Sequence, residues 1–205
     1  RLGAWVLRAA CEQAASWPDE MTVAVNLSPA QLADSALSDH IAQILSDTGL
    51  AAERLELEIT ETAVLADLEG ARRSLSELRR LGVGIALDDF GTGFSSLSLV
   101  RTLPLTRIKI DRSFVGDIDG EAQSTAVVEA IVVLCQGYGL SITGEGVETD
   151  HQRAVLLANG CTDLQGYLVG RPASATQVQA LLASGRREPK AWPFERTSCR
   201  QAGRP

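Results

Sequence analysis

The stretch VGIALDDFGTG, residues 83–93, decides the fold. Its first five residues are apolar apart from one glycine, and Asp88 and Asp89 follow them at once, before a glycine-rich segment. A run without polar alternation is typical of a strand buried on both faces, as in parallel β/α proteins. The two carboxylates therefore lie where such a strand ends. Because Gly82 and Gly84 flank the start of the strand instead of following it, the stretch is not a dinucleotide-binding fingerprint.

The same pattern recurs along the chain. Runs of β-branched and other apolar residues predict six strands, at residues 22–25, 55–59, 83–87, 106–110, 140–143 and 163–164. Apolar residues at helical spacing predict helices at residues 2–16, 37–48, 62–81, 95–102, 121–138, 150–159 and 175–183. Several of these helices are expected to stop at a glycine, namely Gly49, Gly82, Gly139 and Gly160.

The alternation of strands and helices predicts parallel β/α units, arranged either as a doubly wound sheet or as a barrel. Polar residues follow one strand after another, and a β/α barrel assembles its active site from the carboxyl ends of many strands. We therefore expect an α/β fold, a TIM-like (β/α) barrel. Only six of eight units are visible, so the barrel is expected to be incomplete, with about two strands missing before residue 1. We expect the barrel domain over residues 1–184 and a disordered tail over residues 185–205.

The composition fits one globular domain and argues against several functions. The chain has 205 residues, 45% of them hydrophobic, and a formal net charge of −7, which disfavours binding to DNA or RNA. We expect no membrane contact from this segment and a cytoplasmic location, because it shows no long apolar run and no signal sequence. Upstream sensory, cyclase or membrane-anchoring domains are compatible with this. Free thiols are expected at the four widely spaced cysteines, Cys11, Cys135, Cys161 and Cys199.

Each predicted strand ends in, or is followed by, a residue that can bind a metal or move a proton. Any one of them could simply cap a turn or face solvent. Their recurrence at equivalent positions favours function, because parallel strands bring these groups to one rim. The residues are Asn26, Glu58, Asp88, Asp89, Lys109, Glu145 and Gln165.

The chemistry that these groups support is narrow. Amide and carboxylate oxygens are ligands that magnesium and manganese prefer, and zinc is disfavoured. Adjacent Asp88 and Asp89 are expected to need cations between them, and one such carboxylate can bridge two metals about 3.5–4 Å apart. Paired metals suit phosphodiester hydrolysis, with Lys109 orienting the attacking water. An enolase-type barrel, in which a lysine abstracts a carbon-bound proton, is the alternative reaction class.

The motifs at these positions resemble those of the EAL domain family, in the same order. They are Val-Asn-Leu-Ser at 25–28, Glu-Leu-Glu-Ile-Thr-Glu at 56–61, Asp-Asp-Phe-Gly-Thr-Gly at 88–93, Lys-Ile-Asp at 109–111, Glu-Gly-Val-Glu-Thr at 145–149, Gln-Gly-Tyr at 165–167 and Arg-Pro at 171–172. The resemblance implies a modified β/α barrel that hydrolyses cyclic di-GMP to the linear dinucleotide pGpG with Mg²⁺ or Mn²⁺ at a two-metal site, in bacterial signalling. It also implies a homodimer.

The resemblance further implies a role for each matching residue. Metal ligands would be Asn26, Glu58, Asp88, Asp89, Glu145 and Gln165. Lys109 would contact the nucleophilic water, with Asp89 and Glu145 beside it in the catalytic set. Glu61 would anchor the loop after the acid pair, and Asp111 and Glu148 would support the site from behind.

The sequence also departs from the family. The name-giving Glu-Ala-Leu segment, whose glutamate is a metal ligand, does not occur in it, nor does the substrate-gripping arginine near that segment. We therefore expect the chain alone to be weakly active or inactive. Gly144 and Phe94 are milder departures, where the family usually has alanine and often tyrosine. A degenerate EAL domain that acts as a cyclic di-GMP receptor or a protein-interaction module is the alternative.

Overall fold

Six parallel strands form the centre of the molecule. The computed structural model describes residues 2–91, 96–119 and 122–183. The strands form one sheet, each paired in parallel with the next in the sequence. They are β1 (Val23–Asn26), β2 (Leu55–Thr60), β3 (Gly84–Phe90), β4 (Arg107–Ile110), β5 (Ser141–Gly144) and β6 (Asp163–Leu164).

Helices connect successive strands, as parallel pairing requires, and one further helix precedes β1 and one follows β6. They are α1 (Leu2–Ala15), α2 (Pro29–Leu32), α3 (Leu37–Thr48), α4 (Glu61–Leu65), α5 (Leu68–Leu81), α6 (Ser96–Thr102), α7 (Arg112–Gly116), α8 (Ala122–Tyr138), α9 (Asp150–Asn159) and α10 (Ala175–Ala183). Two short 3₁₀ turns, η1 (Ala52–Arg54) and η2 (Asp117–Asp119), complete the described elements.

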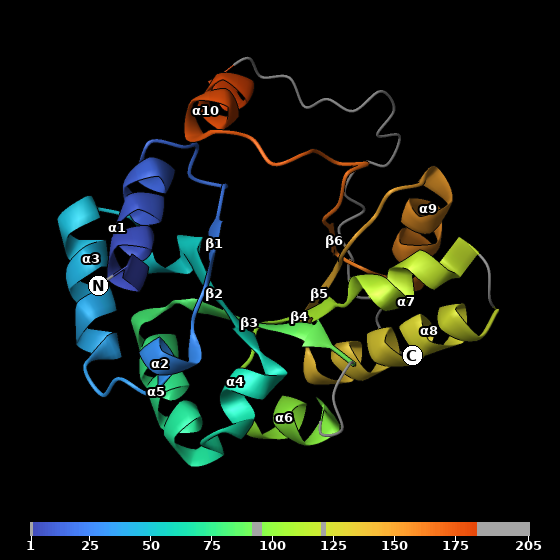
Figure 1. Cartoon of the computed structure of the whole chain (residues 1–205), viewed down its shortest axis with the longest axis horizontal. Helices are drawn as coiled ribbons and strands as arrows, with labels where there is room; N and C mark the ends of the chain where they lie inside the picture. The colour runs from blue at the N-terminus through green and yellow to red at the C-terminus, as the bar shows by residue number, and fades with distance from the viewer. Residues whose placement is uncertain (1, 92–95, 120–121, 184–205) are drawn as a thin grey trace, which may run out of the picture.

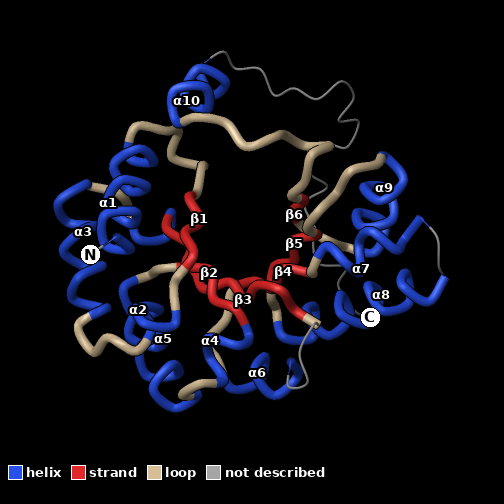
Figure 2. Tube along the Cα trace, in the orientation of Figure 1, coloured by secondary structure: helices blue, strands red, loops and turns tan. Residues whose placement is uncertain are grey.

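The sheet curls into an arc, with helices around its outside (Figure 1). β1 and β6 form the two ends of this arc, and α10 lies on its open side (Figure 2). The predicted TIM-like (β/α) barrel with about six of eight strands is therefore confirmed, and the sheet in the described residues is open. All strands run in the same direction, so their carboxyl ends meet at one rim.

The core lies between the sheet and the surrounding helices. Leu57 and Ile59 of β2 and Ile85 and Leu87 of β3 are completely buried, because every second side chain of a strand faces the same way. Fully burying such a side chain stabilises the fold by about 1.5–3 kcal/mol. The alternate residues face the inside of the arc, and these include the polar residues of the site.

The structure corrects the predicted helices in two ways. The helix expected at 62–81 is two helices, α4 and α5, because Asp67 accepts a hydrogen bond from the backbone N–H of Gly70 and starts a new helix there. The short helices α2 and α7 were not predicted, since four or five residues give no detectable periodicity. The expected helix stops are confirmed by positive φ angles at Gly49, Gly82, Gly139 and Gly160. The tail expected at 185–205 lies outside the described residues.

Two further expectations can be compared with the structure. Cys11, Cys135 and Cys161 are buried and carry free thiols, as predicted, whereas Cys199 lies outside the described residues. Among the described helices, none combines the length and the apolar composition that crossing a bilayer requires.

Candidate active site

The amine of Lys109 is the centre of the polar cluster inside the arc. Its Nζ lies 3.0 Å from Oε1 of Glu58, 3.1 Å from Oδ1 of Asp88 and 2.7 Å from Oε1 of Glu145. Only 4% of the lysine side chain is exposed, and its three partners are 10–14% exposed. Removing one partner of such buried ion pairs is strongly destabilising, because the remaining charge is left buried without a partner.

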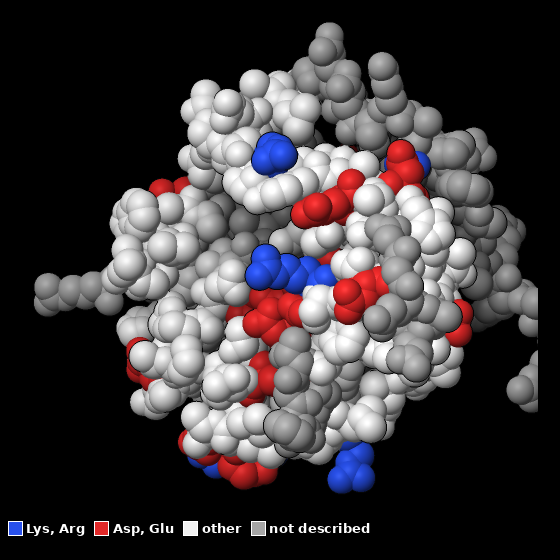
Figure 3. All heavy atoms as spheres, turned by 45° about the vertical axis from the view of Figure 1, so that its right-hand side comes forward, with Lys and Arg blue, Asp and Glu red and all other residues white. Residues whose placement is uncertain are grey.

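Strand geometry brings these four residues together. Glu58, Asp88 and Lys109 lie near the carboxyl ends of β2, β3 and β4, and Glu145 directly follows β5. The backbone N–H of Glu145 donates to the carbonyl of Ile110, which continues the ladder of β4 and β5 beyond the last strand residue. Figure 3 shows acidic side chains gathered with basic ones in the middle of one face of the molecule.

A backbone irregularity adds a fourth carboxylate. Asp89 has a φ of 56°, the only positive φ outside glycine in the described residues, and the pairing of β3 with β4 shifts register between Leu87 and Phe90. Consecutive residues of a regular strand point to opposite faces, but a bulge re-aims a side chain. Ligand oxygens of Asp88, Asp89 and Glu145 consequently all lie within 4.8 Å of one another.

The charges in this cluster are unbalanced. Burial raises the pKa of Glu58 and of Glu145 despite the nearby lysine, and burial together with the charge of Asp88 raises the pKa of Asp89. Burial alone would lower the pKa of the Lys109 amine, but its hydrogen bonds to Glu145 and Glu58 outweigh burial and raise it. The amine therefore stays protonated at neutral pH, and four carboxylates share one positive charge. A divalent cation is the natural counterion for such a set.

The two remaining residues of the predicted metal set lie at the ends of the same rim. Asn26 ends β1 and is the register partner of Glu58, so both face the same side of the sheet. Gln165 directly follows β6, and its backbone N–H donates to the carbonyl of Gly144. Both side chains are exposed. The structure thus brings five of the seven strand-end residues into one cluster and places the other two beside it.

Glu61 lies beneath the start of the segment that follows the acid pair. Its side chain is 4% exposed, and its Oε1 accepts a hydrogen bond of 3.0 Å from the backbone N–H of Gly91. Gly91 has a φ of 99°, and a Cβ there would lie 2.8 Å from the ring of Phe114. Residues 92–95, the rest of this predicted loop, lie outside the described residues.

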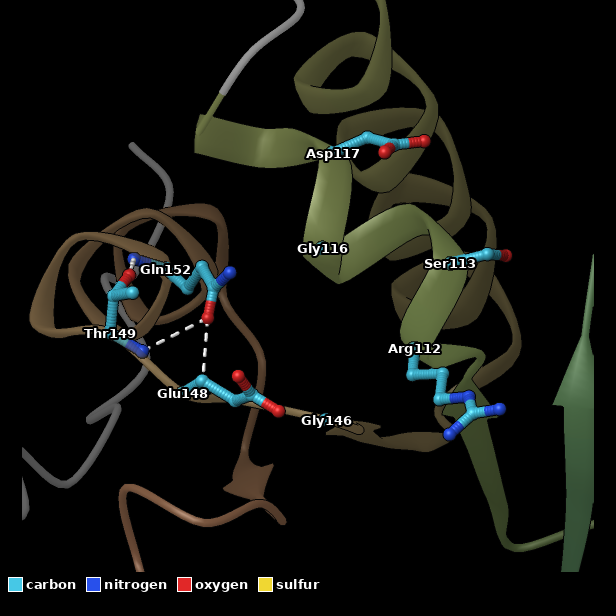
Figure 4. A pocket seen from close by; sticks show the side chains of 8 residues that line it. All are labelled: Arg112, Ser113, Gly116, Asp117, Gly146, Glu148, Thr149 and Gln152. Atoms are coloured by element: carbon cyan, nitrogen blue, oxygen red, sulfur yellow. Dashed lines mark hydrogen bonds between the residues drawn. The ribbon is translucent and has the colours of Figure 1, made fainter.

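Asp111 is the N-cap of α7, and Glu148 lies two residues before α9. Asp111 caps α7 by accepting from the backbone N–H of Ser113. Glu148 is exposed and lines a pocket of about 490 Å³ between α7 and the start of α9 (Figure 4). The buried Gln152 holds the backbone there, because its Oε1 accepts from the N–H groups of Glu148 and Thr149. The contacts of Asp111 are those of a helix cap.

Two polar residues inside the arc were not singled out from the sequence. Arg107 precedes Lys109 by two positions, and Glu56 precedes Glu58 by two. The Nε of Arg107 donates to Oε2 of Glu56 over 3.0 Å. The sequence contained a signal for both residues. Residues two apart on a strand share a face, so the charged residues two positions before Lys109 and Glu58 face the inside of the arc as those site residues do.

The open parallel barrel and its acidic rim are the architecture that the sequence motifs predicted, and comparison with known families agrees with that prediction. The family model of the EAL domain matches residues 1–172. The chain therefore belongs to the EAL domain family, as the motifs indicated.

Relatives of known name support this assignment. The chain is 41% identical over 187 residues to MucR of Pseudomonas aeruginosa, a bifunctional diguanylate cyclase and cyclic di-GMP phosphodiesterase, covering 89% of the chain and 27% of MucR. It spans about a quarter of the length of the curated relatives it matches. The EAL domain of Mycobacterium smegmatis DcpA superimposes with a TM-score of 0.86, at 38% identity over 92% of this chain and 86% of that one. A manganese and cyclic di-GMP complex of Klebsiella pneumoniae BlrP1 gives 0.79, at 31% identity over 84% and 45%.

Proposed function

We propose that this chain is the phosphodiesterase domain of a signalling protein and that its site hydrolyses cyclic di-GMP to pGpG with bound Mg²⁺ or Mn²⁺. The cluster of four carboxylates around the protonated Lys109 carries the proposal. Membership of the EAL family supports it, as do the relatives named for this activity.

The donor set fits two hard divalent cations. The side chains that the described residues place on the rim beside Lys109 offer oxygen ligands, and burial, with a smaller contribution from neighbouring carboxylates, raises the pKa values of Glu58, Asp89 and Glu145. The residues that would hold the metals are Asn26, Glu58, Asp88, Asp89, Glu145 and Gln165. When bound, the cations would polarise the phosphate and lower the pKa of a water molecule.

The side chains of the chain itself have three tasks in this proposal. Lys109 holds three carboxylates in place through its amine, and its charge favours a hydroxide-like water and a developing negative charge on phosphate. Asp89 and Glu145 complete the catalytic set beside it. Glu61 fixes the start of the loop after the acid pair through Gly91. Asp111 and Glu148 act from behind the site.

The state of Lys109 bears on the enolase-type alternative. A lysine that abstracts a carbon-bound proton needs a lowered pKa so that its amine is neutral at working pH. Three carboxylates around Lys109 have the opposite effect. The receptor alternative is disfavoured because every metal-binding motif position visible in the sequence keeps a competent side chain.

Two further proposals concern the setting of the domain. We propose that it works as a homodimer, in keeping with the family resemblance, and in the cytoplasm, where its second messenger is used. Both are open to direct test, by light scattering of the purified chain and by fractionation of cells that express the whole protein.

Cleavage of cyclic di-GMP tests the proposed function. The assay follows pGpG by chromatography, with Mn²⁺, Mg²⁺ or EDTA. It uses the chain itself and an extended chain, in which an N-terminal segment carrying a Glu-Ala-Leu strand is added next to β1. We expect metal-dependent turnover by the extended chain and little by the chain alone, since Glu-Ala-Leu would supply a further carboxylate. Binding of cyclic di-GMP without turnover by the extended chain would assign the protein to the receptor class.

A further inference from the structure

Beneath the rim, the guanidinium of Arg107 links residues from three other strands. Its Nε donates to Oε2 of Glu56 on β2 over 3.0 Å. One terminal nitrogen, Nη1, donates both to Oγ1 of Thr143 on β5, over 3.0 Å, and to Oδ2 of Asp163 on β6, over 2.5 Å. The side chains of Arg107 and Glu56 are only 20% and 19% exposed. A rigid fork of donors can hold several acceptors at fixed angles, which the single charge of lysine cannot do.

Each residue of this network lies two positions before a residue of the candidate active site. Glu56 precedes Glu58, Thr143 precedes Glu145 and Asp163 precedes Gln165. Arg107 itself precedes Lys109. Since residues two apart on a strand share a face, the Arg107 network is the layer of the barrel interior directly below the rim.

Small residues on β3 leave room for this layer. Arg107 is the register partner of Ala86, and Glu56 is the register partner of Gly84, so a contact from β4 to β2 must pass over β3. Both β3 residues at this level are small. A Cβ added to Gly84 would lie 3.4 Å from Cγ of Glu56, which shows how closely the glutamate side chain crosses that position.

β6 is the shortest of the strands that this contact joins. It has two residues, and within the described part of the chain it pairs with β5 alone, through Thr143 with Asp163 and Gly144 with Leu164. The bond from Arg107 to Asp163 attaches this edge strand to β4 as well. Gln165 follows directly, and its backbone is also hydrogen-bonded to Gly144 and Val147, so the contact of Arg107 with Asp163 fixes this segment from a further strand.

We propose that Arg107 is a positioning residue of the metal site. By holding β2, β5 and β6 from below, its guanidinium sets the spacing of Glu58, Glu145 and Gln165 around Lys109. This inference rests on the proposed function, because it concerns the same rim. Groups that orient metal ligands commonly change metal affinity by about 10–100-fold when they are removed.

The test compares Arg107→Lys with Arg54→Lys. Arg54 is a matched control, since its guanidinium is also largely buried but donates to backbone carbonyls of Met21, Ala14 and Pro18, away from the rim. Mn²⁺ dissociation constants are measured by electron paramagnetic resonance and stabilities by urea unfolding. We expect Arg107→Lys to weaken Mn²⁺ binding roughly tenfold. Arg54→Lys is expected to lose stability but to keep its Mn²⁺ affinity.

An unchanged Mn²⁺ affinity in a folded Arg107→Lys variant would overturn the inference, as would an equal loss in Arg54→Lys. If Arg107→Lys does not fold, Asp163→Asn takes its place, with a weaker Mn²⁺ affinity expected and an unchanged one contradicting the inference. Turnover of cyclic di-GMP by the extended chain is measured in parallel. One combination of results separates the two proposals. If the wild type binds Mn²⁺, the variants bind it more weakly and the extended chain shows no turnover, the role of Arg107 is supported and the proposed function is overturned.

Discussion

Asp88 and Asp89 are consecutive in β3, yet carboxylate oxygens of both lie within 4.8 Å of each other and of Glu145. A regular strand would direct the two side chains to opposite faces. The left-handed backbone of Asp89, with a φ of 56°, turns its carboxylate towards the rim instead. Aspartate and asparagine tolerate this conformation better than most residues. The acid pair therefore depends on the backbone as much as on the two side chains.

Asp89→Asn is expected to separate the contribution of the left-handed backbone from that of the carboxylate charge. Asparagine keeps the left-handed backbone but removes a charge, so Mn²⁺ affinity should fall by roughly one order of magnitude, as ligand charge tunes divalent binding. Without metal the variant should be at least as stable as the wild type, because burial and the neighbouring carboxylates, Asp88 first, raise the pKa of Asp89 and so disfavour its charge. Calorimetry with Mn²⁺ and urea unfolding in EDTA measure the two effects. Glu12→Gln on the exposed side of α1 is the control, and an affinity loss no larger than in this control would be evidence against a metal-binding Asp89.

Lys109→Ala should impair turnover more than substrate binding. The amine is proposed to act on the attacking water and the developing charge, so kcat of the extended chain should fall about 10²–10³-fold while KM changes little. Removing one partner of so buried a set should also destabilise the metal-free protein by about 3–5 kcal/mol. Steady-state kinetics at saturating Mn²⁺, on protein shown to be folded by circular dichroism, give the comparison. A raised KM with an unchanged kcat would show that Lys109 binds substrate instead.

Glu61→Ala should loosen the segment after the acid pair. The variant leaves the partly buried N–H of Gly91 without its carboxylate acceptor, which is expected to cost about 1–3 kcal/mol. Glu61→Gln is the matched control, because its amide oxygen can still accept that hydrogen bond. Urea unfolding and Mn²⁺ affinity are measured for both variants. Equal behaviour of alanine and glutamine would contradict the anchoring role.

The folded protein is expected to lose stability at alkaline pH because of the buried thiol of Cys161. Burial raises the pKa of its thiol to about 12, above the value of about 9 expected in the unfolded chain. The folded pKa is the higher one, so this contribution is complete below pH 9 and is lost as the pH rises towards 12. Between pH 8 and pH 10 the wild type should lose about 1–2 kcal/mol more than Cys161→Ala. Urea unfolding at both pH values measures this, and equal losses would argue against a buried neutral thiol.

The strands were predictable from the sequence because burial on both faces leaves a clear mark. Runs such as that ending at Leu87 are apolar throughout, and the strands lie within three residues of their predicted ends. The break at Asp67 was missed, since apolar residues on both sides continue the helical spacing while the side chain of Asp67 caps a new helix. At Asp67 a local hydrogen bond, which the spacing of apolar residues does not reveal, starts a new helix.

The candidate site was predictable in membership but not in geometry. Strand ends identified Lys109 and Glu145 without showing that they lie 2.7 Å apart. The bulge at Asp89 could not be predicted, because it depends on how β3 pairs with β4. Arg107 was missed because an arginine within a short strand resembles an edge residue until its partners on distant strands are known.

Cleavage of cyclic di-GMP by the extended chain, measured with Mn²⁺ and again with EDTA, tests the central claim most directly. The account predicts conversion to pGpG that requires the metal and falls sharply in Lys109→Ala. It also predicts much weaker conversion by the chain without the added Glu-Ala-Leu strand. Turnover that persists in EDTA, or a complete absence of turnover in the folded, Mn²⁺-loaded extended chain, would contradict it.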